Sequence, residues 1–186
     1  MKLVREQVNL SGLLTRSFGV ISPLMNKKAL SFKVVIRGKI CDFYSDAFRL
    51  QQILINLLSN AIKFTNFGSV TISVSVKDDE RIKKYGTSLQ SKKESHNTQQ
   101  HKYIKFSVTD TGIGLEEDEL KSVFKSFEQV TKTPSPRLAI VLIPSQFAAT
   151  KGVKGGTGLG LAICKKMCHL MEGSIHVKRY FVNTRA

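Results

Sequence analysis

The chain has 186 residues, of which 41% are hydrophobic, so it is long enough for one domain with a packed core and too apolar for a disordered tail. Its formal net charge is +15, yet the lysines and arginines are scattered and form no long basic run with interleaved aromatic residues. We therefore expect a solvated positive surface and no nucleic-acid-binding function.

The cysteines and the apolar runs indicate the compartment. Cys41, Cys164 and Cys168 cannot form a disulfide framework and show no metal-ligand spacing, which fits a reducing compartment and predicts a cytoplasmic location. The longest apolar run, Leu138–Ile143, is far shorter than the roughly 20 residues of a membrane span. We expect no membrane contact by this segment, and a membrane-anchored parent protein stays open.

The first predicted elements are a helix and a strand. Apolar residues recur at helical spacing from Asn9 to about Lys27, and Pro23 is expected to bend or end this helix. The alternating run Leu30–Gly38 predicts a strand that stops at its glycine.

The clearest helix follows at residues 45–64, "SDAFRLQQILINLLSNAIKF". Ser45 or Asp46 can cap its N-terminus. Its apolar positions recur at helical spacing and predict a stripe of buried side chains. The predicted stripe consists of Phe48, Ile53, Leu54, Leu57, Leu58, Ala61 and Ile62.

Two strands and a short helix are predicted next. Residues 69–76 and 103–110 alternate as strands, and the polar stretch 77–102 between them is a predicted hairpin loop. Residues 116–127 read as a short amphipathic helix. A strand pair joined by a loop, with helices interspersed, favours a single domain over 1–186 with an α/β two-layer sandwich fold.

The last third begins with a long segment that contains Pro134, Pro136 and Pro144. A glycine-opened helix then runs to Gly173, a plausible C-terminal cap. Residues 174–181 form the last predicted strand.

The helix at residues 45–64 carries an unusual line of polar residues. Gln52, Asn56, Asn60 and Lys63 recur at steps of four, four and three, so they project from one line of the helix surface. Alone, this line indicates a solvated helix edge. Lys63 could supply a charge to phosphates, and Asn60 carries an oxygen suited to Mg²⁺.

Two glycine-containing motifs accompany the polar line. "DTGIG", Asp110–Gly114, follows a predicted strand, so its carboxylate can accept a hydrogen bond from a flat ligand that the glycines allow close to the backbone. "GGTGLGL", residues 155–161, opens a helix, whose N-terminal N–H groups and dipole favour phosphate. It matches neither the P-loop pattern nor the dinucleotide fingerprint.

The ordered blocks "NLLSNAIKFT", "DTGIG", "VFKSFEQ" and "GGTGLGL" resemble the ATP-binding catalytic domain of sensor histidine kinases of the hybrid type, within the GHKL ATPases. The resemblance covers roughly Leu3 to His176. It implies a mixed, mostly antiparallel sheet with three main helices on one face, ATP and Mg²⁺ as ligands, and a long ATP lid at 128–155.

The resemblance also implies roles for individual residues. Asn60 would hold Mg²⁺, Asn56 and Lys63 would contact phosphates, and Asp110 would read the adenine amino group. Other residues would line the nucleotide. These are Phe64, Gly112, Ile113, Gly114, Phe124, Phe127, Gly156, Thr157, Gly158, Leu159 and Gly160.

Asn56 favours phosphoryl transfer over hydrolysis. Hydrolytic members of the GHKL group place a glutamate four residues before the Mg²⁺-binding asparagine, as a base for water. An amide cannot accept that proton near neutral pH. The resemblance therefore implies transfer to a histidine on a separate dimerisation domain, followed by a response-regulator receiver domain, both elsewhere in a parent protein or in trans.

The chain itself is predicted to be an incomplete kinase. None of His96, His101, His169 and His176 has the surroundings of a phosphoacceptor. A degenerate nucleotide-binding regulatory module without transfer activity is the alternative, and a GHKL hydrolase is a third reading.

Two features depart from the family pattern. Residues 134–152 of the lid are unusually apolar, and an insertion, a docking element and a faulty gene model all stay open. The family's final hairpin strand is missing, so the sheet is expected to lose an edge strand.

Overall fold

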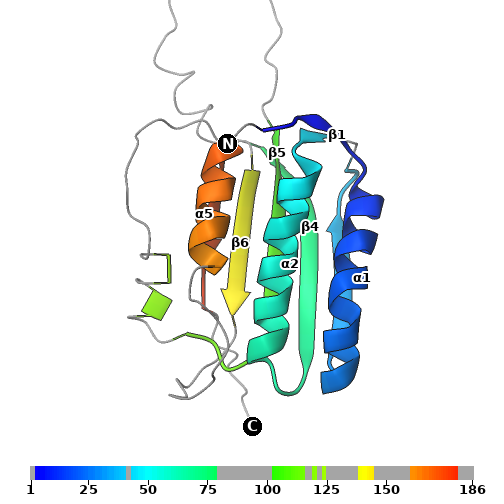
Figure 1. Cartoon of the computed structure of the whole chain (residues 1–186), viewed down its shortest axis with the longest axis vertical. Coiled ribbons are helices and arrows are strands. Elements are labelled where there is room, and N and C mark those ends of the chain that lie inside the picture. Colours follow the sequence, from blue (N-terminus) through cyan, green and yellow to red (C-terminus); the bar gives the residue numbers. More distant parts are fainter. Residues whose placement is uncertain are drawn as a thin grey trace, which may run out of the picture.

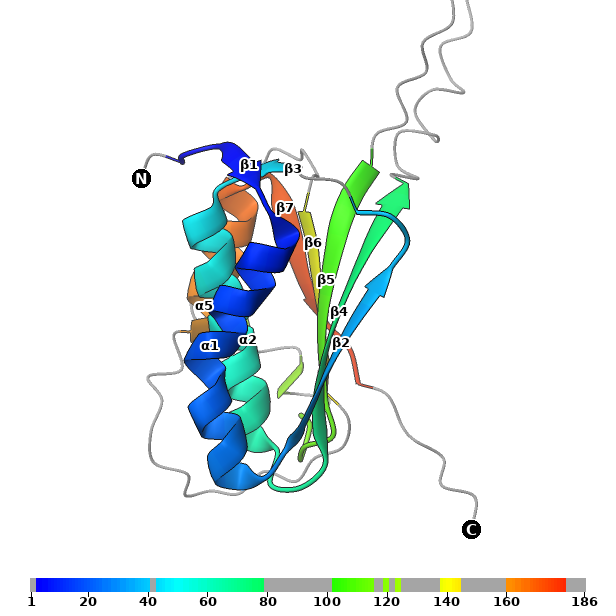
Figure 2. The ribbon, with the colours of Figure 1, turned by 90° about the vertical axis from the view of Figure 1, so that its right-hand side faces the viewer.

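The computed structural model describes residues 3–40, 43–78, 102–115, 119–120, 123–124, 138–144 and 160–179. Within them, helices α1 (Leu10–Lys28), α2 (Ala47–Phe64) and α5 (Gly160–Leu170) lie on one side of a five-stranded sheet (Figure 1, Figure 2). The predicted α/β two-layer sandwich with three helices on one face is confirmed.

The main sheet has the strand order β2-β4-β5-β6-β7. Its strands are β2 (Ser31–Arg37), β4 (Ser69–Asp78), β5 (Lys102–Asp110), β6 (Leu138–Pro144) and β7 (Gly173–Val177). Two short strands that the sequence did not predict, β1 (Glu6–Val8) and β3 (Phe43–Ser45), form a separate antiparallel pair.

The sheet is mixed, as expected, but it is not mostly antiparallel. Among the described pairs of the main sheet, β4–β5 is antiparallel, whereas β2–β4, β5–β6 and β6–β7 are parallel. The difference arises largely from β6, which lies between β5 and β7 and is parallel to both. Its near-continuous apolar sequence is typical of a central strand in a parallel sheet.

Strand β6 also falls within the range assigned to the ATP lid, 128–155. Seven of those residues belong to the sheet, and the others lie outside the described residues, so the lid boundaries stay a prediction. The predicted loop 77–102 is likewise shorter at both ends, because β4 continues to Asp78 and β5 begins at Lys102.

Helix α1 continues through Pro23, which was expected to bend or end it. Asn9 caps the helix by accepting a hydrogen bond from the Gly12 N–H at 2.8 Å. Proline has no N–H for the carbonyl four residues earlier, that of Gly19. The Ser22 hydroxyl donates to this carbonyl at 3.2 Å, so the missing backbone bond is replaced locally.

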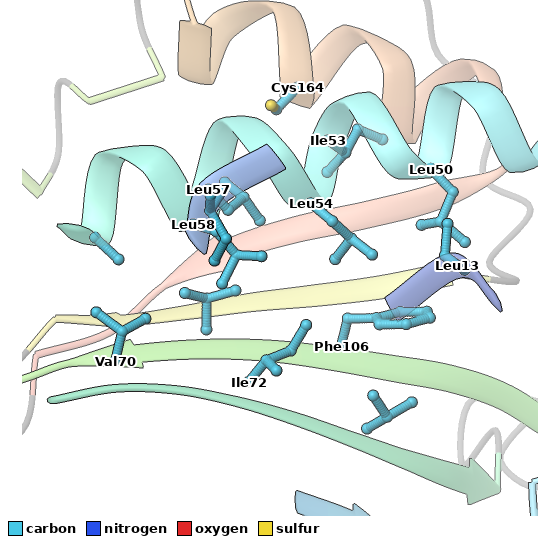
Figure 3. Close-up of a cluster of buried hydrophobic side chains, with 14 of the residues drawn as sticks. Leu13, Leu50, Ile53, Leu54, Leu57, Leu58, Val70, Ile72, Phe106 and Cys164 are labelled. Atoms are coloured by element: carbon cyan, nitrogen blue, oxygen red, sulfur yellow. The ribbon is translucent and has the colours of Figure 1, made fainter. Parts of the chain in front are cut away.

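Helix α2 supplies most of the core. Asp46 caps it by accepting the Arg49 N–H at 2.9 Å, which confirms one of the two predicted caps. Its buried side chains face β4 and β5 and are joined by Cys164 of α5 (Figure 3). Besides Cys164, those labelled are Leu50, Ile53, Leu54, Leu57 and Leu58 from α2, Leu13 from α1, and Val70, Ile72 and Phe106 from the sheet.

Phe48 was wrongly assigned to this buried stripe, because its side chain is 62% exposed. It lies in the first turn of α2, where the Arg49 guanidinium sits 5.4 Å from its ring centroid. The core face of α2 therefore begins at Leu50, and the other face is left for polar side chains. No helix within the described residues is long and apolar enough to cross a membrane.

Candidate nucleotide-binding site

The polar line predicted on α2 is present as a hydrogen-bonded edge. The Asn60 Nδ2 atom donates to the Asn56 Oδ1 atom at 3.1 Å, one helical turn away. One turn further back, Gln52 accepts a hydrogen bond from Arg49 at 2.9 Å. Because its nitrogen is engaged by Asn56, the Asn60 amide presents its oxygen as the end that can coordinate a cation.

The first residue of α5 lies against this asparagine pair. A Cβ atom added to Gly160 would lie 2.6 Å from the Asn56 Nδ2 atom, so only glycine fits beside the present Asn56 rotamer. The start of α5, with its N–H groups and positive dipole end, is thereby brought beside α2. The other predicted residues of this motif lie outside the described residues. They are Gly156, Thr157, Gly158 and Leu159.

The "DTGIG" turn is attached to the other end of α2. The Gly112 N–H donates to the Asp110 Oδ1 atom at 2.8 Å, and the Ile113 N–H donates to the Phe64 carbonyl at 3.1 Å. Gly114 has a φ of +66°, which favours glycine. The turn thus bends back from the end of β5 onto the last residue of α2.

Gly112 is required here by close packing. An added Cβ would lie 2.4 Å from the Phe64 carbonyl oxygen and 2.8 Å from the Asp110 Oδ1 atom. Backbone and carboxylate therefore approach each other with no room for a side chain between them.

The two ends of the site are separated along α2. Phe64 follows Asn56 by eight residue steps, which corresponds to about 12 Å at 1.5 Å per residue. A ligand that contacts both Asn56 and the Asp110 turn must therefore be extended, with one end suited to phosphate and the other to a hydrogen-bond donor.

Lys28 of α1, a residue not predicted to belong to the site, holds the end of α2. Its Nζ atom donates to the carbonyls of Ile62 at 2.8 Å, Lys63 at 2.8 Å and Thr65 at 2.9 Å. These carbonyls at the end of the helix have no partner within it, and an ammonium group also complements the negative end of the helix dipole. No local pattern in the sequence links residues more than thirty positions apart in this way.

Thr111 is a second residue that was not predicted to belong to the site. Its hydroxyl accepts the Ser69 N–H at 2.9 Å, which fastens the turn to the start of β4. Ser69 begins one predicted strand and Thr111 follows the end of the other, which was a weak signal that the two lie close together. The register pair Val70–Asp110 places them side by side, each one residue beyond the pair.

The aromatic residues predicted at the site are only partly described. The Lys63 Nζ atom lies 5.0 Å from the centroid of the Phe64 ring, whose side chain is at the surface. Phe124 is partly buried and packs against the core, and Phe127 lies outside the described residues.

No cluster of three or more His, Cys, Asp or Glu side chains among the described residues could hold a metal. Cys164 and Cys168 are buried core residues, and burial raises the pKa of each thiol to about 12. They are packing groups of the core.

Burial also raises the pKa of the Asp110 carboxyl from 3.8 to about 6, against the lowering effect of backbone N–H donors, that of Gly112 first. The folded protein therefore holds this proton more tightly than the unfolded chain does. The stability is greatest when the carboxyl is protonated and falls as the pH rises from about 4 to about 6.

Asp110→Asn is expected to remove this pH-dependent loss. Compared with the parent, the variant should gain stability on the order of 1–2 kcal/mol at pH 7–8, and the gain should shrink below pH 6. Urea unfolding of both proteins between pH 4 and pH 8 measures the difference. A difference that stays constant over this range would contradict the raised pKa.

Comparisons with known proteins show the family and the fold. The sequence profile of the family described as "Histidine kinase-, DNA gyrase B-, and HSP90-like ATPase" matches residues 45–185. The chain belongs to this family, and it has the fold of an ATP-binding catalytic domain of histidine kinases.

Several curated relatives share similar levels of identity. The chain is 30% identical over 182 residues to hybrid signal transduction histidine kinase B of Dictyostelium discoideum, covering 97% of the chain but 8% of the relative. It is 31% identical over 179 residues to the sensor protein GacS of Pseudomonas syringae, covering 95% of the chain and 16% of the relative. The chain thus spans less than a fifth of the length of these proteins.

Solved structures show the same fold. Full-length ShkA in complex with AMPPNP matches 92% of this chain with a TM-score of 0.58 and 24% identity, over 27% of that structure. The catalytic domain of histidine kinase ThkA matches 90% of this chain with a TM-score of 0.55 and 22% identity, over 82% of that structure.

Proposed function

We propose that the chain binds ATP with Mg²⁺ along the polar edge of α2 and transfers the γ-phosphate to a histidine on a separate dimerisation domain. The observation that carries the proposal is the hydrogen-bonded pair Asn56–Asn60 beside Gly160, with the Asp110 turn fastened about 12 Å away along the same helix. This spacing fits a nucleotide that extends from base to phosphates.

The roles follow from the chemistry at each end. The Asp110 carboxylate accepts a hydrogen bond from the adenine amino group, and Gly112 lets the base approach the turn. At the other end, Asn56 donates its amide N–H and Lys63 its charge to phosphate oxygens. The Asn60 oxygen holds Mg²⁺, which neutralises phosphate charge when bound.

Transfer rather than hydrolysis is favoured by Asn56. Its amide oxygen accepts from Asn60, and a neutral amide cannot take a proton from water. In the transfer step, a histidine nitrogen forms a bond to the γ-phosphorus while the bond from that phosphorus to the bridging oxygen breaks, and ADP leaves. The imidazole proton passes to solvent.

The partners are then a histidine-bearing dimerisation domain and a response-regulator receiver domain. The relatives named as hybrid histidine kinases support this, as does the structure of ThkA in complex with response regulator protein TrrA. Both partner domains would lie elsewhere in a longer parent protein or on other chains. The cytoplasm supplies the ATP that this activity consumes.

Asn60→Ala is expected to weaken Mg²⁺-ATP binding at least tenfold, because it removes the proposed metal ligand. Titration calorimetry with ATP in the presence of Mg²⁺ and of EDTA measures the effect, which should vanish in EDTA. Asn26→Ala, on the exposed end of α1, is the control and should bind like the parent. Parental Mg²⁺-ATP affinity of Asn60→Ala would exclude the proposed metal site.

A regulatory nucleotide-binding module without transfer activity is the second reading, and the lack of a recognised phosphoacceptor histidine in the sequence favours it. Incubating the chain and labelled ATP with a histidine kinase dimerisation domain separates the two. Acid-labile phosphate on the dimerisation domain supports transfer. Intact ATP binding without label, under conditions where a known kinase domain labels the same acceptor, supports the module.

A further inference from the structure

The face of the sheet that points away from the helices is strongly basic. Side chains alternate between the two faces of a strand, and residues directly opposite in neighbouring strands share a face. Val70, Ile72, Val74, Phe106 and Val108 are buried in the core cluster that the sheet forms with the helices. The intervening residues of β4 and β5 therefore point to the other side, which lies opposite the helices in Figure 2.

The strand register places four cations on this side. Lys33 is paired with Thr71, and Arg37 with Ser75, which is in turn paired with Lys105. In the next row, Lys77 of β4 is paired with Tyr103. We call this surface the basic face, defined by Lys33, Arg37, Lys77 and Lys105 with the hydroxyl residues Thr71, Ser73, Ser75 and Thr109.

The described part of the basic face carries no carboxylate that could neutralise these charges. Among the described residues that β2, β4, β5 and β7 place on this side, none is Asp or Glu. Lys33, Arg37 and Lys77 are exposed and Lys105 is half-buried. Arg37 and Lys105 are two strands apart, about 10 Å, and Lys33 is about 13 Å from Arg37 along β2. These separations exceed the Debye length of about 8 Å, so physiological salt largely screens the repulsion between the cations, and each of them can pair with a separate anionic group.

We propose that the basic face is a docking surface for an acidic protein partner. Carboxylates of such a partner would accept hydrogen bonds from the lysines, the arginine and the hydroxyls between them, so the charges of the two surfaces would be complementary. This surface lies on the side of the sheet opposite α2, so docking leaves the proposed nucleotide site uncovered.

The composition of the basic face disfavours other polyanions. Single-stranded nucleic acids are bound by stacking on aromatic side chains, and Tyr103 is the one Phe, Tyr or Trp that β2, β4, β5 and β7 place on this side. Anionic membranes recruit exposed apolar or aromatic side chains beside the cations, whereas the ones that β2, β4, β5 and β7 place on this side within the described residues are Val35 and Tyr103, both partly buried. Short hydroxyls between cations match carboxylate groups spaced along a protein surface.

The first test uses a fluorescent twelve-residue peptide of alternating Glu and Ser with the complete chain. We expect saturable binding that weakens with added salt. The triple variant Lys33→Glu, Arg37→Glu, Lys105→Glu should reduce affinity at least tenfold. The control Lys27→Glu, Lys165→Glu, Lys166→Glu makes the same charge change at exposed positions of the helical layer and should reduce it less than threefold.

The outcomes separate the proposal from its rivals and from the proposed function. Equal losses of affinity in both triple variants would show that net charge alone causes the binding and would overturn the proposal. The absence of peptide binding at 1 mM, which corresponds to a binding free energy of about 4 kcal/mol, would overturn it as well. Tighter binding of oligo(dT) or phosphatidylserine vesicles with the same dependence on the basic face would overturn the protein assignment. Thermal unfolding shows whether each variant is folded. If the charge-reversal triple variant does not fold, the triple variant Lys33→Gln, Arg37→Gln, Lys105→Gln takes its place. Mg²⁺-ATP binding is measured separately and should stay parental in every variant.

Discussion

Gly112→Ala is expected to abolish tight ATP binding and to lower the free energy of unfolding by about 1–3 kcal/mol. The added methyl would lie 2.4 Å from the Phe64 carbonyl oxygen, which is backbone and cannot swing aside. The turn must therefore move away from α2 and lose the hydrogen bond from the Ile113 N–H to Phe64. Because Asp110 is held by the same turn, its carboxylate would leave the position proposed for reading adenine.

Gly19→Ala is the matched control for this prediction. Gly19 lies in the middle of α1, and a Cβ there meets nothing within 4 Å. Alanine in an exposed helix interior should stabilise the protein by about 0.5–1 kcal/mol and leave ATP affinity unchanged. Urea unfolding and titration calorimetry on both variants give the comparison, and parental ATP affinity in Gly112→Ala would disprove the role of the turn.

Local chemistry made the individual elements predictable. Asp46, one of the two predicted caps, does cap α2, and α1 begins one residue after the predicted start at Asn9. The alternation in residues 69–76 and 103–110 predicted two strands, which pair with each other. The line from Asn56 to Asn60 followed from helical periodicity alone, and its hydrogen bond shows that the two side chains do meet.

Features that depend on tertiary pairing were not predictable from the sequence. An apolar run such as Leu138–Ile143 has no intrinsic partner, so its place as a parallel strand between β5 and β7 could not be read from its composition. Pro23 illustrates the same limit at short range, because the hydroxyl that replaces the lost backbone bond belongs to Ser22. The clustering of Lys33, Arg37 and Lys105 required the strand register, since along the chain these residues look scattered.

Lys28→Met is expected to lower the free energy of unfolding by about 2–3 kcal/mol, because it removes three hydrogen bonds from a charged donor to carbonyls at the end of α2. The methionine stem replaces the packing of the lysine stem but leaves those carbonyls without their donor. The effect should extend to the nucleotide, since the neighbouring Phe64 carbonyl is where the Asp110 turn is fastened. We expect ATP affinity to fall several-fold at temperatures well below unfolding.

Lys27→Met separates this local role from a general loss of charge. Lys27 is exposed and lies in the same last turn of α1, so its removal should cost less than about 0.5 kcal/mol and leave ATP affinity parental. Lys28→Arg retains the charge, but a planar guanidinium cannot direct one nitrogen at three carbonyls, so it should recover only part of the stability. If Lys28→Met and Lys27→Met behave alike in urea unfolding and in ATP titration, α1 does not position the nucleotide site. A loss of stability and ATP affinity that occurs in Lys28→Met alone, and that Lys28→Arg partly restores, would show that α1 does position the site. It would do so through Lys28, which lies more than thirty residues before the end of α2 in the sequence.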